Sequence, residues 1–91
     1  MTVGEELQEM GFDEVVYFPD FEDECIIGID TDGRAIYSYE KMVNFLIEEG
    51  MDDIEAIEWL EYNTIHALPY IDSQTEGKAP IIMYSRTWLN F

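Results

Sequence analysis

The sequence predicts a single α+β domain, 1–91, in which a small and mainly antiparallel sheet is covered by a central helix pair. Two runs rich in β-branched and aromatic residues flank the turn sequence TDG and predict a hairpin over 25–38. Two segments with helical periodicity follow, and a further apolar run at 81–88 supplies a C-terminal strand. A chain of 91 residues has room for one thin core.

The chain is expected to begin with a short helix over 3–10, whose apolar side chains share one face and which Gly11 ends. The run VVYF, at 15–18, predicts a strand that Pro19 stops. A charged connection, DFEDE, then leads to the hairpin.

The hairpin turn is centred on Asp32 and Gly33, because an Asp-Gly pair supplies the positive φ angles of a tight turn. The same stretch, DTDG, invites a calcium interpretation because it carries two carboxylates and a glycine. A calcium loop of the EF-hand kind has its glycine later and a closing glutamate, and both features are missing here. The turn is therefore the favoured interpretation.

Two helices, over 39–49 and 53–66, form the central pair. Ser38 is suited to capping the first helix, and Asp52 with a glutamate three residues later has the spacing of a capping box for the second. Pro69 disfavours a helical residue before it, so the second helix is expected to end nearby.

The end of the second helix carries three polar residues, Asn63, Thr64 and His66. Side chains of these types can satisfy the last carbonyls of a helix and fasten the following loop. The favoured interpretation is a structural lock at the helix end. The alternative is a small-ligand site formed by the same residues.

Cys25 is the only cysteine, so an intrachain disulfide is impossible and a reducing cytoplasm fits best. Pairing Cys25 with the only histidine, His66, would give a thiol nucleophile and a base, but a cysteine that opens an apolar strand is usually buried. A structural zinc site needs four ligands. No phosphate-binding loop, other catalytic motif or apolar run of membrane-spanning length is present. We therefore expect no catalysis, metal, cofactor or membrane association.

The charge is strongly unbalanced, with 21 acidic and four basic residues and a formal net charge of −17. Residues 1–33 contain no Lys or Arg. Such a chain is repelled by a nucleic acid backbone, so direct nucleic acid binding is excluded. A basic protein surface or a bound cation is the natural complement.

Carboxylates held on rigid helices and turns can imitate the spaced charges of a phosphate backbone and so occupy a basic groove. The alternative is that the acidity serves solubility only, although ordinary soluble domains intersperse both signs. Aromatic residues between the carboxylates would act as apolar anchors: Tyr17, Phe18, Phe21, Trp59 and Tyr62. The expected partner-binding residues are Asp20, Glu22, Asp23, Glu24, Glu48, Glu49, Asp52, Asp53, Glu55 and Glu58.

The central region 32–84, which contains DGRAIYSYEKMVNFLIEEGMDDIEAIEWLEYNTIHALPY followed by APIIMY, covers more than half of the chain. Together with the size, the acidity and the lack of catalytic motifs, it resembles the small acidic proteins that phages and prophages encode against host machinery, such as anti-CRISPR proteins and other DNA mimics. These proteins share no common motif, so the resemblance transfers no functional residue. It implies a partner class, namely a defence nuclease such as Cas9 whose DNA-binding site an acidic surface blocks.

The expected function is therefore a non-enzymatic inhibitor, acting in the cytoplasm of a bacterial host on a protein with a basic nucleic-acid-binding surface. One alternative is a structural or adaptor module that forms a homodimer through exposed aromatic residues. Another is a small-ligand binder or enzyme centred on Asn63 to His66.

Overall fold

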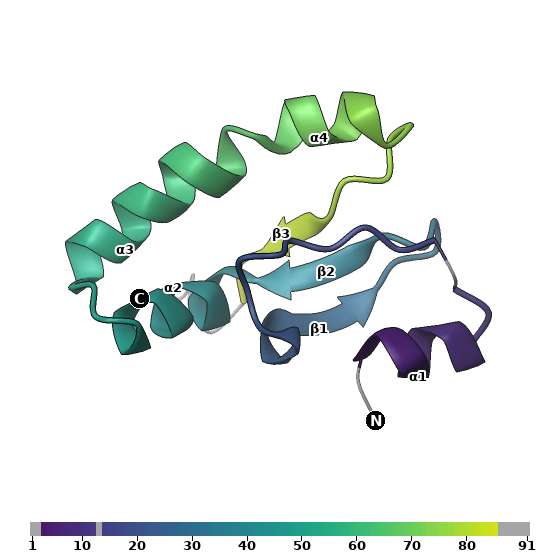
Figure 1. Ribbon diagram of the computed structural model, residues 1–91, viewed down its shortest axis with the longest axis horizontal. Coiled ribbons are helices and arrows are strands. Elements are labelled where there is room, and N and C mark those ends of the chain that lie inside the picture. Colours follow the sequence, from purple (N-terminus) through teal and green to yellow (C-terminus); the bar gives the residue numbers. More distant parts are fainter. Residues whose placement is uncertain (1–2, 13, 86–91) are drawn as a thin grey trace.

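The computed structural model describes residues 3–12 and 14–85, and it has the α+β fold expected from the sequence (Figure 1). A three-stranded sheet is accompanied by a short N-terminal helix and by helices that connect its second and third strands. The elements in chain order are α1 (Val3–Glu9), a 3-10 turn (Asp23–Cys25), β1 (Ile26–Ile29), β2 (Ala35–Ser38), α2 (Tyr39–Glu48), α3 (Asp53–Leu60), a π-helical turn (Glu61–Ile65), α4 (Leu68–Gln74) and β3 (Ile81–Met83).

The sheet has the order β1-β2-β3 and is mixed. The predicted hairpin is confirmed, since β1 and β2 pair antiparallel with Ile29 opposite Ala35. β3 instead pairs parallel to β2, with Ile36 opposite Ile81, so the antiparallel character holds for the hairpin alone. The connection through α2, α3 and α4 returns the chain to the start of β2, as parallel strands require. The part of the expected strand at 86–88 lies outside the described residues.

The hairpin turn is organised by Asp30 as well as by the Asp-Gly pair. One carboxylate oxygen, Oδ1 of Asp30, accepts hydrogen bonds from the backbone N–H groups of Asp32, at 2.9 Å, and Arg34, at 2.8 Å. Of the expected pair, Gly33 alone has a positive φ, of 82°. The turn is therefore longer than the expected two-residue turn, with an aspartate side chain replacing part of the backbone bonding.

The expected strand at 15–18 is wrong, because this segment pairs with none of the described strands. The backbone N–H of Phe18 donates to the Tyr37 hydroxyl, at 2.9 Å, where a strand would donate to a neighbouring carbonyl. The Phe18 and Tyr37 rings also pack together, with centroids 4.8 Å apart. Tertiary packing onto β2 therefore overrides the strand propensity of the segment.

Both predicted helix caps are confirmed. Ser38 Oγ accepts from the backbone N–H of Lys41, at 3.2 Å, and begins α2. Asp52 Oδ1 accepts from the backbone N–H of Glu55, at 2.8 Å, and begins α3. The α2 helix ends before Gly50, whose φ of 113° suits a residue without a Cβ atom.

The predicted stop at Pro69 is wrong, and a bent helix continues to Gln74. Leu68, expected to be extended, opens α4, and Pro69 occupies its first turn, where a missing N–H leaves no intrahelical bond unmade. The bend follows the π-helical turn, where the backbone N–H of His66 donates to the Glu61 carbonyl, five residues earlier. Figure 1 shows the bent helix passing along one side of the sheet.

The core lies between this helical layer and the sheet face that carries Ala35 and Tyr37. Its largest fully buried side chains include Tyr37, Met42 and Leu60, from β2, α2 and α3. The buried cluster comprises Phe18, Phe21, Cys25, Ala35, Tyr37, Tyr39, Met42, Val43, Leu46, Ala56 and Leu60.

Candidate functional site

The expected partner-binding carboxylates all lie at the surface, on three segments of the chain. These are the loop and 3-10 turn at 20–24, the junction of α2 and α3 at 48–53, and the exposed side of α3. We call these ten side chains the acidic surface. They are Asp20, Glu22, Asp23, Glu24, Glu48, Glu49, Asp52, Asp53, Glu55 and Glu58.

Phe21 holds the first segment against the helix pair. Its side chain is 8% exposed, and its ring centroid lies 5.6 Å from that of Phe45 on α2 and 6.0 Å from that of Trp59 on α3. An aromatic residue in a run of carboxylates thus fixes the loop on both helices. The expectation that Phe18 and Phe21 are exposed anchors is wrong, because both are buried in the core.

Two of these segments line one hollow of about 190 Å³. Glu22 and Glu24 from the loop line it together with Glu48 from α2, although they are far apart in the sequence. Lys41 and Asn44 also line this hollow, and no local sequence signal indicates that α2 turns these side chains toward the loop. The hollow can receive a cationic or hydrogen-bonding group, with Lys41 offsetting part of its negative charge.

A second hollow, of about 260 Å³, is lined by two of the three carboxylate-bearing residues of α3. Glu55 and Glu58 line it together with Trp59 and Tyr62. Both of these aromatic residues were expected beside the carboxylates. The remaining residues of the acidic surface line neither hollow, and the Asp52 carboxylate caps α3.

The hairpin turn between β1 and β2 lies at the end of the sheet away from α2 (Figure 1), and two basic side chains donate hydrogen bonds there. The guanidinium Nε of Arg34 donates to the Ala79 carbonyl, at 2.7 Å, and Lys78 Nζ donates to the Asp32 carbonyl, at 2.6 Å. These bonds fasten the turn to the segment that enters β3. The positive charges of Arg34 and Lys78 therefore have a structural role away from the acidic surface.

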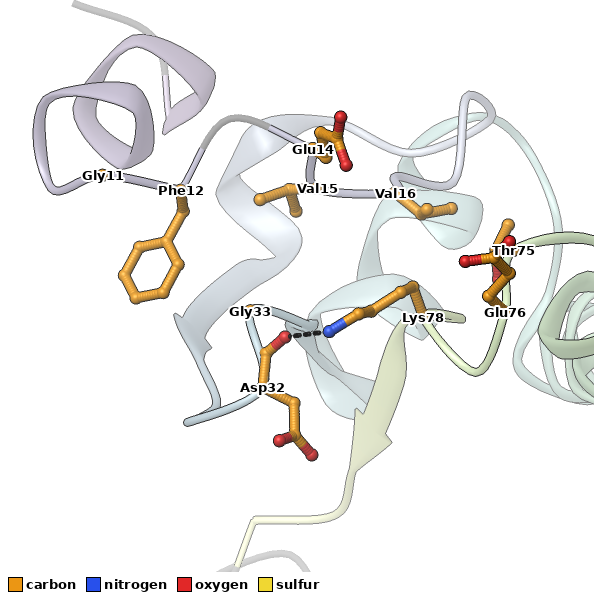
Figure 2. A pocket seen from close by; sticks show the side chains of 10 residues that line it. All are labelled: Gly11, Phe12, Glu14, Val15, Val16, Asp32, Gly33, Thr75, Glu76 and Lys78. Atoms are coloured by element: carbon orange, nitrogen blue, oxygen red, sulfur yellow. Dashed lines mark hydrogen bonds between the residues drawn. The ribbon is translucent and has the colours of Figure 1, made fainter.

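A hollow of about 390 Å³ lies at this turn, between the end of α1 and the loop after α4. Figure 2 shows the carboxylates of Glu14 and Asp32 on opposite sides of it, while the Lys78 amine is bonded to a backbone carbonyl. The side chains drawn do not converge on a point where a substrate could react. We therefore do not assign chemistry to this hollow.

Cys25 is buried, and His66 is exposed on the bent helix. Burial raises the pKa of the Cys25 thiol, and the negative charge of Glu22 raises it further. A nucleophilic cysteine needs the opposite shift, toward the thiolate. Within 3–12 and 14–85, no cluster of three or more potential ligands of the His, Cys, Asp and Glu types is arranged to hold a metal ion.

The polar residues at 63–66 do not end a helix, so the predicted lock is wrong in that respect. The side-chain amide of Asn63 donates to the Trp59 carbonyl, at 3.0 Å, one turn back within the helix. Thr64 is buried, whereas the exposed His66 ring has its centroid 5.7 Å from that of Tyr62. These contacts support the π-helical turn and its bend.

No protein-family model matches the chain, and neither a curated protein nor a solved structure is significantly similar to it. Among the described helices, none is both long enough and apolar enough to cross a bilayer.

Proposed function

We propose that this protein is a non-enzymatic inhibitor that occupies a basic nucleic-acid-binding site of a defence nuclease, such as Cas9. One observation supports the proposal above all: Glu22, Glu24 and Glu48 line the same hollow. The packed Phe21 ring holds the loop in this position. This arrangement joins the carboxylates of two chain segments into one surface. Because the backbone of both segments is held by packing, the freedom lost on binding is mainly that of the glutamate side chains.

The electrostatics support a protein partner with a basic groove. A net charge of −17 repels nucleic acid and attracts a groove lined by Lys and Arg. Complementary charge of this kind increases the association rate and excludes partners of the wrong sign. Because added salt screens these interactions, binding should weaken as ionic strength rises.

The test is displacement of DNA from a purified nuclease. Cas9 with its guide RNA is bound to a fluorescent DNA target, and the protein is titrated in while the anisotropy is read. We expect the protein to release the DNA, with higher concentrations required at higher salt. The absence of displacement at any salt concentration would contradict the proposal for Cas9. Affinity capture from nuclease-treated bacterial lysate, with elution by DNA, extends the test to other nucleases.

Matched variants assign the effect to the acidic surface. The triple variant Glu22→Gln, Glu24→Gln and Glu48→Gln removes the carboxylates from the first hollow. We expect it to displace DNA about tenfold less effectively. The control removes three carboxylates that line neither hollow of the acidic surface, two on α1 and one in the segment after it: Glu6→Gln, Glu9→Gln and Glu14→Gln. Equal losses in both triple variants would show that net charge alone determines the effect.

Homodimerisation is the second candidate, favoured by apolar side chains on the sheet face opposite the core. Ile27 and Met83 are each 41% exposed, and Ile36 and Ile81 are paired on neighbouring strands of that face. A dimer held by such contacts would resist salt, unlike the charge-driven complex. Sedimentation equilibrium at low and high salt separates the two candidates.

A further inference from the structure

We propose that the second hollow of the acidic surface binds an arginine side chain presented by a basic partner protein. The hollow is lined by Met51, Glu55, Glu58, Trp59, Tyr62 and Asn63. The partner class in this inference rests on the proposed function. The chemistry of the hollow does not. It assigns one residue type of the partner to one place on this chain.

Helical spacing brings the lining residues together. Residues three, four and seven positions apart lie on one side of a helix, so Glu55, Trp59 and Tyr62 share a side with Glu58 close by. Met51 adds an apolar contact from the α2–α3 connection. The result is a shallow site with carboxylates and aromatic rings at the same surface.

Packing holds the Trp59 ring, which lines the hollow, in place. Trp59 is only partly exposed, and its ring meets the buried Phe21 ring edge to face. The Asn63 amide donates to the Trp59 carbonyl, at 3.0 Å, which ties the floor of the hollow to the same helical turn. Tyr62, by contrast, is 75% exposed, and its ring centroid lies 5.7 Å from that of His66. A partly buried ring and an exposed ring therefore both line the hollow.

The combination of groups selects a cation. Carboxylates exclude anions, and the π faces of Trp and Tyr attract positive charge. Guanidinium fits better than ammonium, since it is planar, stacks on a ring and donates two parallel hydrogen bonds to one carboxylate. Arginine is also a residue type that nucleic-acid-binding grooves use for phosphate. An inhibitor that captures such an arginine would remove a phosphate contact directly.

The test uses isotope-labelled full-length protein and three acetylated, amidated tripeptides with the sequence Gly-X-Gly. X is arginine, lysine or the neutral arginine analogue citrulline. Resonances of the Trp59 indole N–H and the Asn63 side-chain amide are followed by NMR, after assignment with Trp59→Phe and Asn63→Asp. We expect saturable shifts with the arginine peptide, smaller ones with lysine and none with citrulline.

Two matched pairs of variants separate the hollow from general acidity. Glu58→Gln should weaken arginine-peptide binding about fivefold, whereas Glu49→Gln, with the same charge change outside the hollow, should leave it within about twofold. Tyr62→Ala should weaken it similarly, whereas Tyr70→Ala, which removes another exposed tyrosine, should not. Equal losses within each pair, or equal shifts from citrulline and arginine, would overturn the inference.

The same variants distinguish this inference from the proposed function. If the wild-type protein displaces DNA from a nuclease but the arginine peptide causes no saturable shift, the arginine site is wrong and the inhibitor proposal stands. If the arginine peptide binds the hollow but no nuclease releases its DNA, the site stands and the inhibitor proposal is wrong.

Discussion

The Tyr37 hydroxyl accepts a hydrogen bond from the backbone N–H of Phe18, at 2.9 Å. Tyr37 is fully buried in β2, and Phe18 lies three residues before Phe21, which fixes the acidic loop on the helices. The bond therefore connects the centre of the sheet to the segment that positions the acidic surface. Its loss should affect both stability and the placement of that loop.

Tyr37→Phe removes the hydroxyl and leaves the Phe18 N–H without this acceptor in a buried place. We expect the free energy of unfolding to fall by about 1–2 kcal/mol, measured by urea denaturation. Tyr70→Phe, at a residue that is 68% exposed, is the control and should change it by less than about 0.5 kcal/mol. A Tyr37→Phe protein as stable as the wild type would show that the hydroxyl contributes nothing net.

Alkaline pH should destabilise the fold through the same residue. Burial raises the pKa of Tyr37 from 10.0 to about 12. Above pH 10 the unfolded chain releases the tyrosine proton while the folded chain retains it, so stability is lost between pH 10 and pH 12. The contribution is about 2–3 kcal/mol. Urea denaturation at successive pH values should show a smaller alkaline loss for Tyr37→Phe, and an identical loss would contradict the assignment.

Asp52→Ala should destabilise the protein by about 1 kcal/mol, because it removes the side-chain cap that begins α3. Asp52→Asn keeps an acceptor oxygen and removes the charge, so it should retain most of the stability. Thermal denaturation of both variants separates the cap from the charge. If both lose the same stability, the carboxylate charge is what matters at this position.

Salt should have opposite effects on folding and on partner binding. A net charge of −17 destabilises the compact state by self-repulsion, so we expect the melting temperature to rise between about 0.01 M and 0.15 M ionic strength. Binding to a basic groove should weaken over the same range. Calorimetry of the protein and displacement assays of the complex test the two effects. A melting temperature that is independent of salt would show that the charges are too dispersed to repel strongly.

Local sequence signals predicted the hairpin and the caps at Ser38 and Asp52, because each depends on residues a few positions apart. The segment at 15–18 was misassigned because its decisive hydrogen bond comes from a tyrosine in β2. The direction of β3 was missed for a similar reason, since it depends on the path of the whole helical connection.

The sequence shows which residues carry carboxylates but not how the fold assembles them. It favours an exposed Phe21, whereas the burial of this ring brings Glu22 and Glu24 to the same hollow as Glu48. Nothing local distinguishes a buried phenylalanine from an exposed one within a charged run. The contact of Phe21 with Trp59 joins residues far apart in the chain, and such packing follows from the complete fold.

The parallel pairing of β2 with β3 affects how the chain folds while the ribosome synthesises it. β3 follows all the described helices, so the sheet remains incomplete until residues 81–83 have been synthesised. Closing so long a loop is slow compared with forming the hairpin, and until then one edge of β2 lacks its neighbour. The abundant negative charge also discourages nascent chains on the same messenger from associating through that edge. Acidity would then protect the immature chain as well as shape the mature surface.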